Sequence, residues 1–379
     1  MTYPTISHFI ESITGIFIPL PIQTFGFFIV SAFFAAQYFI KKEFLRLESI
    51  GILKSTPISN KENQFESILD YIINGLMSFL LGYKIIHVIK NYEFFAKKPQ
   101  DILLSSDGNI LLGVCFLIAT SIYIYHGKQK INAIEVKNIL PSQLSWNFIF
   151  IAGISGIIGA KLFSVFEDID YLIQDPLNAL FSFSGLTFYG GFIFGALAVI
   201  LYGKKYNIKI TYLADTFAPS LILAYGIGRM GCHFSGDGDW GILSNMNIKP
   251  SIIPEWMWGY NFPNNVIEVG EKIEGCVGMY CYQLPYLVYP TSLYEAIFGI
   301  IAFLFLYNIK TYIKIPGVLF SIYLILNGME RFLIEIIRVT EKYTLFGLNL
   351  TQAQIIGLII IFIGIGGVFY LNNVKHESI

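Results

Sequence analysis

Residues 213–241 read LADTFAPSLILAYGIGRMGCHFSGDGDWG, an apolar segment that runs directly into a glycine-rich stretch with charged side chains. The polar part, residues 228–241, places one arginine, one histidine and two aspartates between glycines. Charged groups beside a lipid-soluble segment cost free energy unless they have partners or a function. The order of the two parts therefore indicates a transmembrane helix that ends in a functional site at the membrane surface. A tight structural turn that contains charges is the alternative.

The composition of the whole chain indicates a membrane protein. Of the 379 residues, 55% are hydrophobic and only 13% are charged, and the mean hydropathy of +0.61 excludes a soluble globule. A hydrocarbon core about 30 Å thick needs about 20 apolar residues per helix. Nine segments meet this need, near residues 24–40, 70–90, 108–125, 146–165, 179–202, 211–226, 291–309, 316–337 and 352–371. We predict an all-α, polytopic transmembrane helical bundle of seven to nine spans, with residues 1–379 in a single integral membrane domain.

The basic residues of the loops predict the orientation. They gather in alternate loops, at 41–61, 128–137, 204–209 and 310–314, and none precedes Lys41. Cytoplasmic loops are enriched in lysine and arginine, so the amino terminus is predicted to face outward and these loops inward. The lysines between residues 90 and 98 disagree with this pattern. The chain has no basic stripe of the kind that binds nucleic acid, and nucleic acid is therefore not an expected partner.

The connection 242–290 is predicted to be an extracytoplasmic loop. Its many tryptophans and tyrosines suit the lipid headgroup layer. Two interpretations remain open: a cap that lies on the membrane, or a small exposed domain with an aromatic core of its own. Cys276 and Cys281 lie close together on this oxidising side and are candidates for a disulfide.

Arg229 is the first candidate ligand for an anion, and a phospholipid headgroup is the expected class. Its planar guanidinium offers a fork of donors that suits phosphate. Glycines of the same stretch, including Gly241, let backbone amides approach an anion closely. Ser235 is a further candidate for substrate binding there. Asp237 or Asp239 is expected to orient Arg229 or to bind headgroup hydroxyls, and the sequence does not decide between them.

The segment ERFLIEIIR at 330–338 supplies a second group of charges. Arg331, Glu335 and Arg338 recur at i, i+4 and i+7 and so share one face of a helix. In hydrocarbon such a face must point toward partners or water. We assign Arg331 and Glu335 to catalysis and Arg338 to substrate binding. A structural ion pair that holds helices together is the alternative.

Several blocks in the same order resemble the bacterial prolipoprotein diacylglyceryl transferase family. They are PIQTFG at 21–26, GAKLFSVFED at 159–168, FYGGFIFG at 188–195, the stretch 213–241 quoted above, YPTSLYEA at 289–296 and ERFLIEIIRVTE at 330–341. The resemblance covers most of the chain from about residue 146 onward and the first span. It leaves residues 41–145 as an expected insertion with extra spans, whose expected role is peripheral packing.

The resemblance implies an activity and a place in the cell. The diacylglyceryl group of phosphatidylglycerol would pass to the lipobox cysteine thiol in the signal peptide of a preprolipoprotein, and glycerol 1-phosphate would leave. The expected partners are phosphatidylglycerol, preprolipoprotein signal peptides and membrane lipids, without a metal or an organic cofactor. The implied location is the bacterial cytoplasmic (inner) membrane, with the site toward the outer leaflet, in agreement with the loop charges.

The sequence departs from the family at the expected base. Tyr189 stands where the family has the histidine of its HGG segment, and a tyrosine is a poor base at neutral pH because its pKa is about 10. His233 is our candidate replacement, although a histidine that only hydrogen-bonds a loop is an equal alternative. Phe25 replaces a tyrosine of the family and loses its hydroxyl. Gly190 is expected to serve helix packing and to border the cavity. Glu295 is a substrate-binding candidate with a structural alternative.

A transporter or channel for an anionic solute is the alternative from another class. Arg331, Glu335 and Asp215 would then line a pathway through the membrane. Such folds contain internal repeats with broken helices. No such repeat is visible in the sequence, which favours the transferase.

Overall fold

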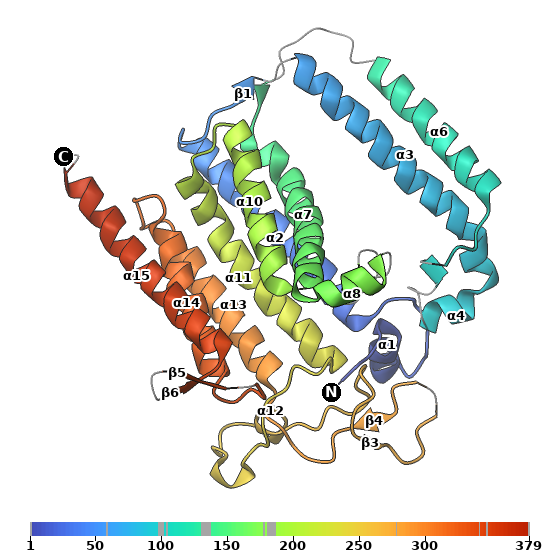
Figure 1. Cartoon of the computed structure of the whole chain (residues 1–379), viewed down its shortest axis with the longest axis vertical. Helices are drawn as coiled ribbons and strands as arrows, with labels where there is room; N and C mark the ends of the chain where they lie inside the picture. The colour runs from blue at the N-terminus through green and yellow to red at the C-terminus, as the bar shows by residue number, and fades with distance from the viewer. Residues whose placement is uncertain are drawn as a thin grey trace. The chain divides into compact units, whose positions relative to one another are not determined.

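The computed structural model describes residues 2–57, 60–97, 102–103, 105–129, 138–176, 179, 187–277, 279–340, 342–345 and 348–377. The longer helices are α2 (Thr24–Ser49), α3 (Asn60–Lys90), α6 (Ile110–Gln129), α7 (Ser145–Glu167), α10 (Phe188–Lys205), α11 (Ile210–Ser235), α13 (Thr291–Ile309), α14 (Val318–Ile334) and α15 (Gln352–Glu377) (Figure 1). The short helical elements are α1 (Ile6–Thr14), α4 (Tyr92–Lys97), η1 (Pro141–Leu144), α8 (Ile169–Gln174), η2 (Met246–Ile248) and α12 (Glu255–Trp258). Short antiparallel strands pair β1 (Thr56–Pro57) with β2 (Asn138–Ile139), β3 (Glu271–Lys272) with β4 (Tyr282–Gln283), and β5 (Tyr343–Leu345) with β6 (Leu348–Leu350).

The predicted all-α membrane fold is confirmed. Each of the nine predicted spans coincides with one of the longer helices, although residues 180–186 of the fifth span and the basic segment 130–137 lie outside the described residues. Five helical segments of the described chain are long and apolar enough to cross a membrane: Thr24–Ser49, Pro141–Glu167, Ile210–Ser235, Thr291–Ile309 and Gln352–Asn373. The other long helices have shorter or less apolar stretches.

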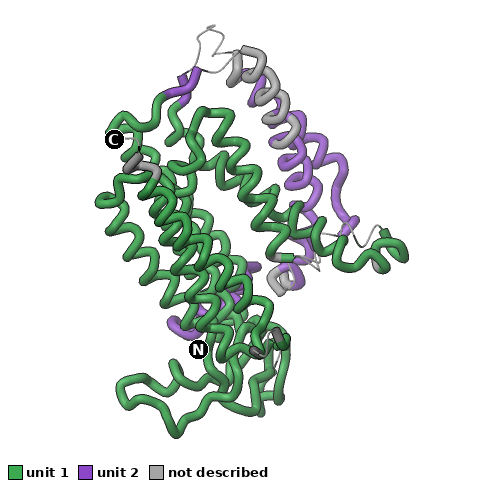
Figure 2. The backbone as a smooth tube through the Cα atoms, turned by 60° about the vertical axis from the view of Figure 1, so that its left-hand side comes forward, with its two compact units in different colours: residues 1–4, 25–54, 140–379 green, residues 5–24, 55–139 purple. Residues whose placement is uncertain are grey.

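The chain divides into two compact units, which Figure 2 shows in different colours. The first unit contains residues 1–4, 25–54 and 140–379, and in it α7 packs on α10, α11 on α13, and α14 on α15. The second unit contains residues 5–24 and 55–139, and in it α3 packs on α6. The predicted insertion at 41–145 stays a prediction, and most of its residues belong to the second unit.

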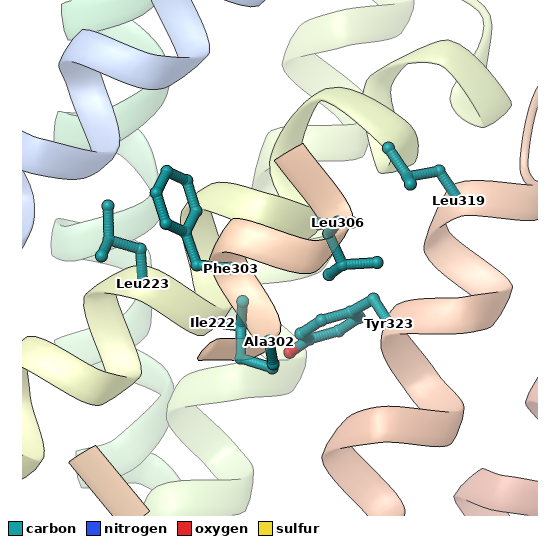
Figure 3. Packing of buried hydrophobic residues seen from close by; sticks show 8 residues of the cluster. Ile222, Leu223, Ala302, Phe303, Leu306, Leu319 and Tyr323 are labelled. Atoms are coloured by element: carbon teal, nitrogen blue, oxygen red, sulfur yellow. The ribbon is translucent and has the colours of Figure 1, made fainter. Parts of the chain in front are cut away.

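The core that positions the site lies between α11, α13 and α14. Its buried side chains are Ala218, Ile222, Leu223, Ala302, Phe303, Leu306, Leu319 and Tyr323 (Figure 3). Gly226 of α11 and Gly299 of α13 lie in backbone contact, because a Cβ atom on Gly299 would stand 2.8 Å from the Cα atom of Gly226. Small residues at such crossings let transmembrane helices approach closely. The spacing of α11 and α13 is therefore set by their backbones.

Two polar contacts secure the end of the first unit away from the glycine-rich stretch. Both carboxylate oxygens of Asp215 accept backbone hydrogen bonds from the start of α14, at 2.7 Å from Gly317 N and 2.8 Å from Phe320 N. Lys310 Nζ donates to Glu43 Oε2 at 2.7 Å between two buried side chains. Asp215 thus caps a helix whose first amides have no partner inside the helix. This use of both oxygens argues against a place for Asp215 in a transport pathway.

The loop 242–290 has a small apolar core of its own. Phe262, Leu284 and Val288 are buried in it, with Trp240 and Tyr260 packed against them. Cys276 and Cys281, which the sequence offered as candidates for a disulfide, are bonded to each other. The loop therefore holds its shape partly by itself, in line with the interpretation as a small domain. Ile248 and Ile252 nevertheless remain exposed on its surface.

Candidate active site

The end of α11, the start of α13 and the end of α14 lie at one end of the bundle (Figure 1). Six charged side chains meet there. We call them the arginine–carboxylate cluster: Arg229, Asp239, Glu295, Arg331, Glu335 and Arg338. Each of the three arginines lies within ion-pair distance of at least two of the three carboxylates. All six residues were predicted as site residues from the sequence. Their convergence is the main structural result for function.

Asp239 joins two of the arginines. Its Oδ2 atom accepts a hydrogen bond from Arg229 Nη1, and its Oδ1 atom accepts one from Arg338 Nη2 at 2.5 Å. Burial alone would raise the pKa of the Asp239 carboxyl, but the two guanidinium groups outweigh it and hold that pKa below its usual value. Asp239 is therefore a carboxylate at neutral pH. Between Asp237 and Asp239, which the sequence left undecided, it is Asp239 that orients Arg229.

Glu295 is the buried centre of the cluster. Its side chain is fully inaccessible to solvent, and its carboxylate lies 3.3 Å from Arg229 Nε, 3.4 Å from Arg338 Nη1 and 3.8 Å from Arg331 Nη1. A buried carboxylate is stable only with such compensation. Burial lowers the pKa of Arg338, but the carboxylates of Asp239 and Glu295 outweigh it and raise that pKa above its ordinary value. The three guanidinium groups are therefore held around one point.

The segment with Arg331, Glu335 and Arg338 differs from the predicted continuous helix. Helix α14 ends at Ile334, so that Glu335 follows the last turn and Arg338 lies beyond it. Arg331 Nη2 still lies 3.4 Å from Glu335 Oε2, as the predicted shared face requires. Arg338, beyond the end of the helix, reaches Asp239 through the hydrogen bond from its Nη2 atom.

Gly241 fixes the position of Arg338 through the backbone. The two residues form an antiparallel bridge, and beside it Ile242 N donates to Ile337 O at 2.8 Å. A Cβ atom on Gly241 would stand 2.5 Å from Ile337 O, so a larger residue does not fit. Gly241, a substrate-binding candidate of the sequence, therefore serves the site by allowing a close approach of two segments.

The remaining polar residues of the glycine-rich stretch shape the turn after α11. Asp237 Oδ1 accepts a hydrogen bond from Asp239 N at 3.3 Å, and the Ser235 hydroxyl donates to Cys232 O at 3.3 Å. One atom each of Cys232, Asp237 and Asp239 that could bind a metal ion lies within 4.8 Å of the other two. Two guanidinium groups already hold the Asp239 carboxylate, so a metal cation would have to compete with them. Substrate contacts of Ser235 and Asp237 remain predictions.

His233 lies deep under the loop rather than among the charges. Its side chain is 2% exposed, and its ring centre lies 5.6 Å from those of Phe234, Tyr260 and Phe262. The Nδ1 atom has no hydrogen-bond partner among the residues that the structure describes. The described contacts therefore surround His233 with aromatic rings, and its role as the base stays a prediction.

The other site candidates lie on α2 and α10. Phe25 packs against Gly231, where a Cβ atom would stand 3.4 Å from its ring. Gly190 lies against the carbonyl of Gly159, which confirms its predicted role in helix packing. Tyr189 precedes it in the first turn of α10, where its side chain is partly exposed. The place of Tyr189 and Phe25 in the reaction stays a prediction.

Two residues of the site, Tyr225 and Glu330, lie within the sequence blocks 213–241 and 330–341 but were not predicted as site residues. The Tyr225 hydroxyl oxygen lies 3.1 Å from Oε1 of Glu295 and 3.1 Å from Oε1 of Glu330, within hydrogen-bond distance of both. The guanidinium of Arg229 lies over the Tyr225 ring, with Cζ 5.2 Å from the ring centre. Tyr225 precedes Arg229 by one helical turn, which is the signal that would have placed it on the same face.

The fold and the site define a class of protein: a multi-helix membrane protein in which three partly buried arginines pair with carboxylates at one end of the bundle. A sequence model of the family described as prolipoprotein diacylglyceryl transferase matches residues 110–370. The chain therefore belongs to the prolipoprotein diacylglyceryl transferase family.

Relatives from three bacteria agree with this assignment, and each is named phosphatidylglycerol–prolipoprotein diacylglyceryl transferase. The protein of Leptospira interrogans (strain Fiocruz L1-130) is 31% identical over 261 residues, which cover 62% of this chain and 71% of the relative. The protein of Staphylococcus haemolyticus is 30% identical over 230 residues (60% and 73%). The protein of Clostridium botulinum (strain Langeland) is 34% identical over 235 residues (61% and 81%).

Proposed function

We propose that the protein transfers the diacylglyceryl group of phosphatidylglycerol to the lipobox cysteine thiol of a preprolipoprotein, the lipid-attachment step of lipoprotein maturation. Family membership supports the reaction, and the relatives' names supply the two substrates. The structural observation that carries the proposal is the meeting of Arg229, Arg331 and Arg338 at one end of the bundle. A phosphodiester needs such charge beside it when it becomes a leaving group.

The chemistry assigns a task to each part of the cluster. The thiolate sulfur attacks the glyceryl carbon that carries the phosphate ester, so that a carbon–sulfur bond forms as the carbon–oxygen bond breaks. The electron pair of the broken bond stays on the phosphate oxygen, and the proton that the thiol gave up to become a thiolate passes to a base, for which His233 is the candidate. Arg229, Arg331 and Arg338 stabilise the departing phosphate, while Asp239 and Glu295 hold the guanidinium groups in position.

The transfer assay tests this function directly. Detergent-purified full-length protein is incubated with phosphatidylglycerol and a lipobox peptide, and both glycerol phosphate release and the mass of the peptide are measured. We expect Arg229→Ala to abolish both signals and Arg229→Lys to retain part of them, because lysine keeps the charge but lacks the planar fork.

Arg46→Ala is the matched control, since Arg46 pairs with Glu43 on α2, away from the cluster. It should retain transfer. Absence of both products from the unmodified protein, together with solute flux through vesicles that contain it, would overturn the proposal in favour of the transporter.

We infer that the site faces the outer leaflet of a bacterial inner membrane. The basic loops and the disulfide in 242–290 support this orientation. A Cys115→Ser protein that carries Ile252→Cys should react in intact cells with a membrane-impermeant maleimide, whereas one that carries Lys314→Cys should not. The reverse labelling pattern would exclude this orientation.

A further inference from the structure

One phenol group in the site faces two carboxyl groups, and it has a single proton. Tyr225 Oη lies 3.1 Å from Glu295 Oε1 and 3.1 Å from Glu330 Oε1. A tyrosine hydroxyl can donate one hydrogen bond, and a carboxylate can only accept. Two ionised carboxylates at this distance from one hydroxyl would leave one of them facing an oxygen lone pair. One of the two glutamates must therefore carry a proton of its own.

The surroundings identify the protonated glutamate. Glu295 lies within 3.8 Å of three guanidinium groups, which stabilise its charge. Glu330 is 5% exposed, and no lysine, arginine or histidine among the described residues lies within ion-pair distance of it. The titratable and charged groups of the neighbouring elements that face it are Tyr225 and Arg229 of α11 and Glu295 of α13, with Arg331 beside it on α14. An ionised Glu330 carboxylate would be buried without a cationic partner within ion-pair distance among the described residues, which is costly.

The charge of the site points to the same residue. The arginine–carboxylate cluster contains three arginines and three acidic groups, so it is neutral when all six are ionised. An ionised Glu330 would make the cluster and its neighbour net negative. A site that must accept an anionic phosphate would then repel it. With its proton, Glu330 adds no charge.

We propose that Glu330 is a protonated positioning residue whose carboxylic acid donates a hydrogen bond to Tyr225, so that the phenol of Tyr225 donates to Glu295. This chain of two hydrogen bonds, from α14 through α11 to α13, holds the Glu295 carboxylate toward the three arginines. Glu330 acts on the reaction through Glu295 and does not touch the substrate. The assignment of an effect on catalysis rests on the transferase function proposed above, but the protonation state does not.

Infrared spectroscopy tests the protonation without any assay of activity. A carboxylic acid has a carbonyl band well separated from those of a carboxylate, so the difference spectrum between the unmodified protein and Glu330→Gln at pH 7 should contain one acid band. Glu255→Gln, which changes an exposed glutamate of α12, is the control and should remove no acid band. Absence of the acid band from the Glu330→Gln difference spectrum would overturn the proposal.

Transfer kinetics test the positioning role. Glutamine retains a donor for Tyr225, so Glu330→Gln should keep kcat within about threefold, whereas Glu330→Leu and Tyr225→Phe should each lower it at least about tenfold, as the loss of a hydrogen bond to a charged group allows. The Glu330→Gln variant has no carboxylic acid at position 330. Its pH profile of kcat should match that of the unmodified protein at low pH. At the pH where Glu330 ionises, kcat of the unmodified protein should fall, whereas kcat of the variant should not. A Glu330→Gln variant as impaired as Glu330→Leu would refute the role. A protein without any transferase activity would refute the function instead and leave the infrared result standing.

Discussion

Replacement of Gly241 by alanine tests how tightly the structure constrains Arg338. The added Cβ atom would stand 2.5 Å from Ile337 O and 2.9 Å from Thr291 Cγ2. Ordinary contact begins at 3.4 Å, so the segment with Gly241 and the segment with Arg338 must separate by about 0.9 Å. The backbone bridge between them and the neighbouring hydrogen bond from Ile242 N would then weaken.

The displacement predicts a large kinetic effect. A misplacement of about 1 Å in a positioned catalytic group costs roughly 100-fold in rate, which corresponds to about 2.7 kcal/mol in activation free energy. We expect Gly241→Ala to lower kcat of the transfer reaction by about this factor while the protein still inserts into the membrane. The assay measures glycerol phosphate release at saturating phosphatidylglycerol and lipobox peptide, so that the effect on kcat is separated from that on KM.

Two further variants distinguish this cause from general loss of structure. Gly153→Ala places its Cβ atom 3.8 Å from the Phe33 ring, which is an ordinary contact, and should leave kcat unchanged. Adding Gly241→Ala to Arg338→Ala should cause little further loss, because both changes act on the same guanidinium. Transfer by Gly241→Ala within twofold of the unmodified protein would refute the reasoning, as would full additivity in the double variant.

Three other substitutions distinguish the roles of Asp239, Asp237 and His233. Asp239→Asn should lower kcat/KM at least about tenfold, because Arg229 and Arg338 each lose a charge-assisted hydrogen bond. Asp237→Asn should lower kcat/KM by less than about threefold. Equal losses would contradict the assignment of Asp239 as the residue that orients Arg229. Because the pKa of Asp239 is lowered in the folded protein, its contribution to stability is complete above about pH 4 and is lost as the pH falls through the folded-state pKa. The thermal unfolding temperatures of the unmodified protein and of Asp239→Asn should therefore converge in acid. His233→Gln should slow transfer and remove one limb of its pH profile if His233 is the base, and an unchanged profile would exclude it.

The sequence predicted the membrane fold and the charged members of the site because both have strong local signals. Apolar runs of sufficient length identify spans, and charges inside or beside such runs identify functional positions. Arg229, Arg331 and Glu335 could be nominated on that ground alone. The choice of Asp239 over Asp237 could not be made, because the two aspartates are two residues apart in one glycine-rich turn and the sequence does not show which carboxylate turns toward the arginines.

Other features of the site depend on contacts between distant segments. Tyr225 and Glu330 are 105 residues apart in the chain, and nothing in either local pattern pairs them. The position of Arg338 depends on the end of α14 at Ile334 and on the bridge to Gly241, which a helical repeat of charges does not reveal. Periodicity predicts which face of a helix carries a residue, whereas the partner across the bundle follows only from packing.

The backbone contact between Gly226 and Gly299 links the geometry of the site to the crossing of α11 and α13. Gly226 lies three residues before Arg229, and Gly299 lies four residues after Glu295, so the closest point of the two helices is about one turn from the charged pair. The position of Arg229 relative to Glu295 therefore depends on how closely these two backbones cross. An added carbon atom at either glycine would wedge the two helices apart at this crossing.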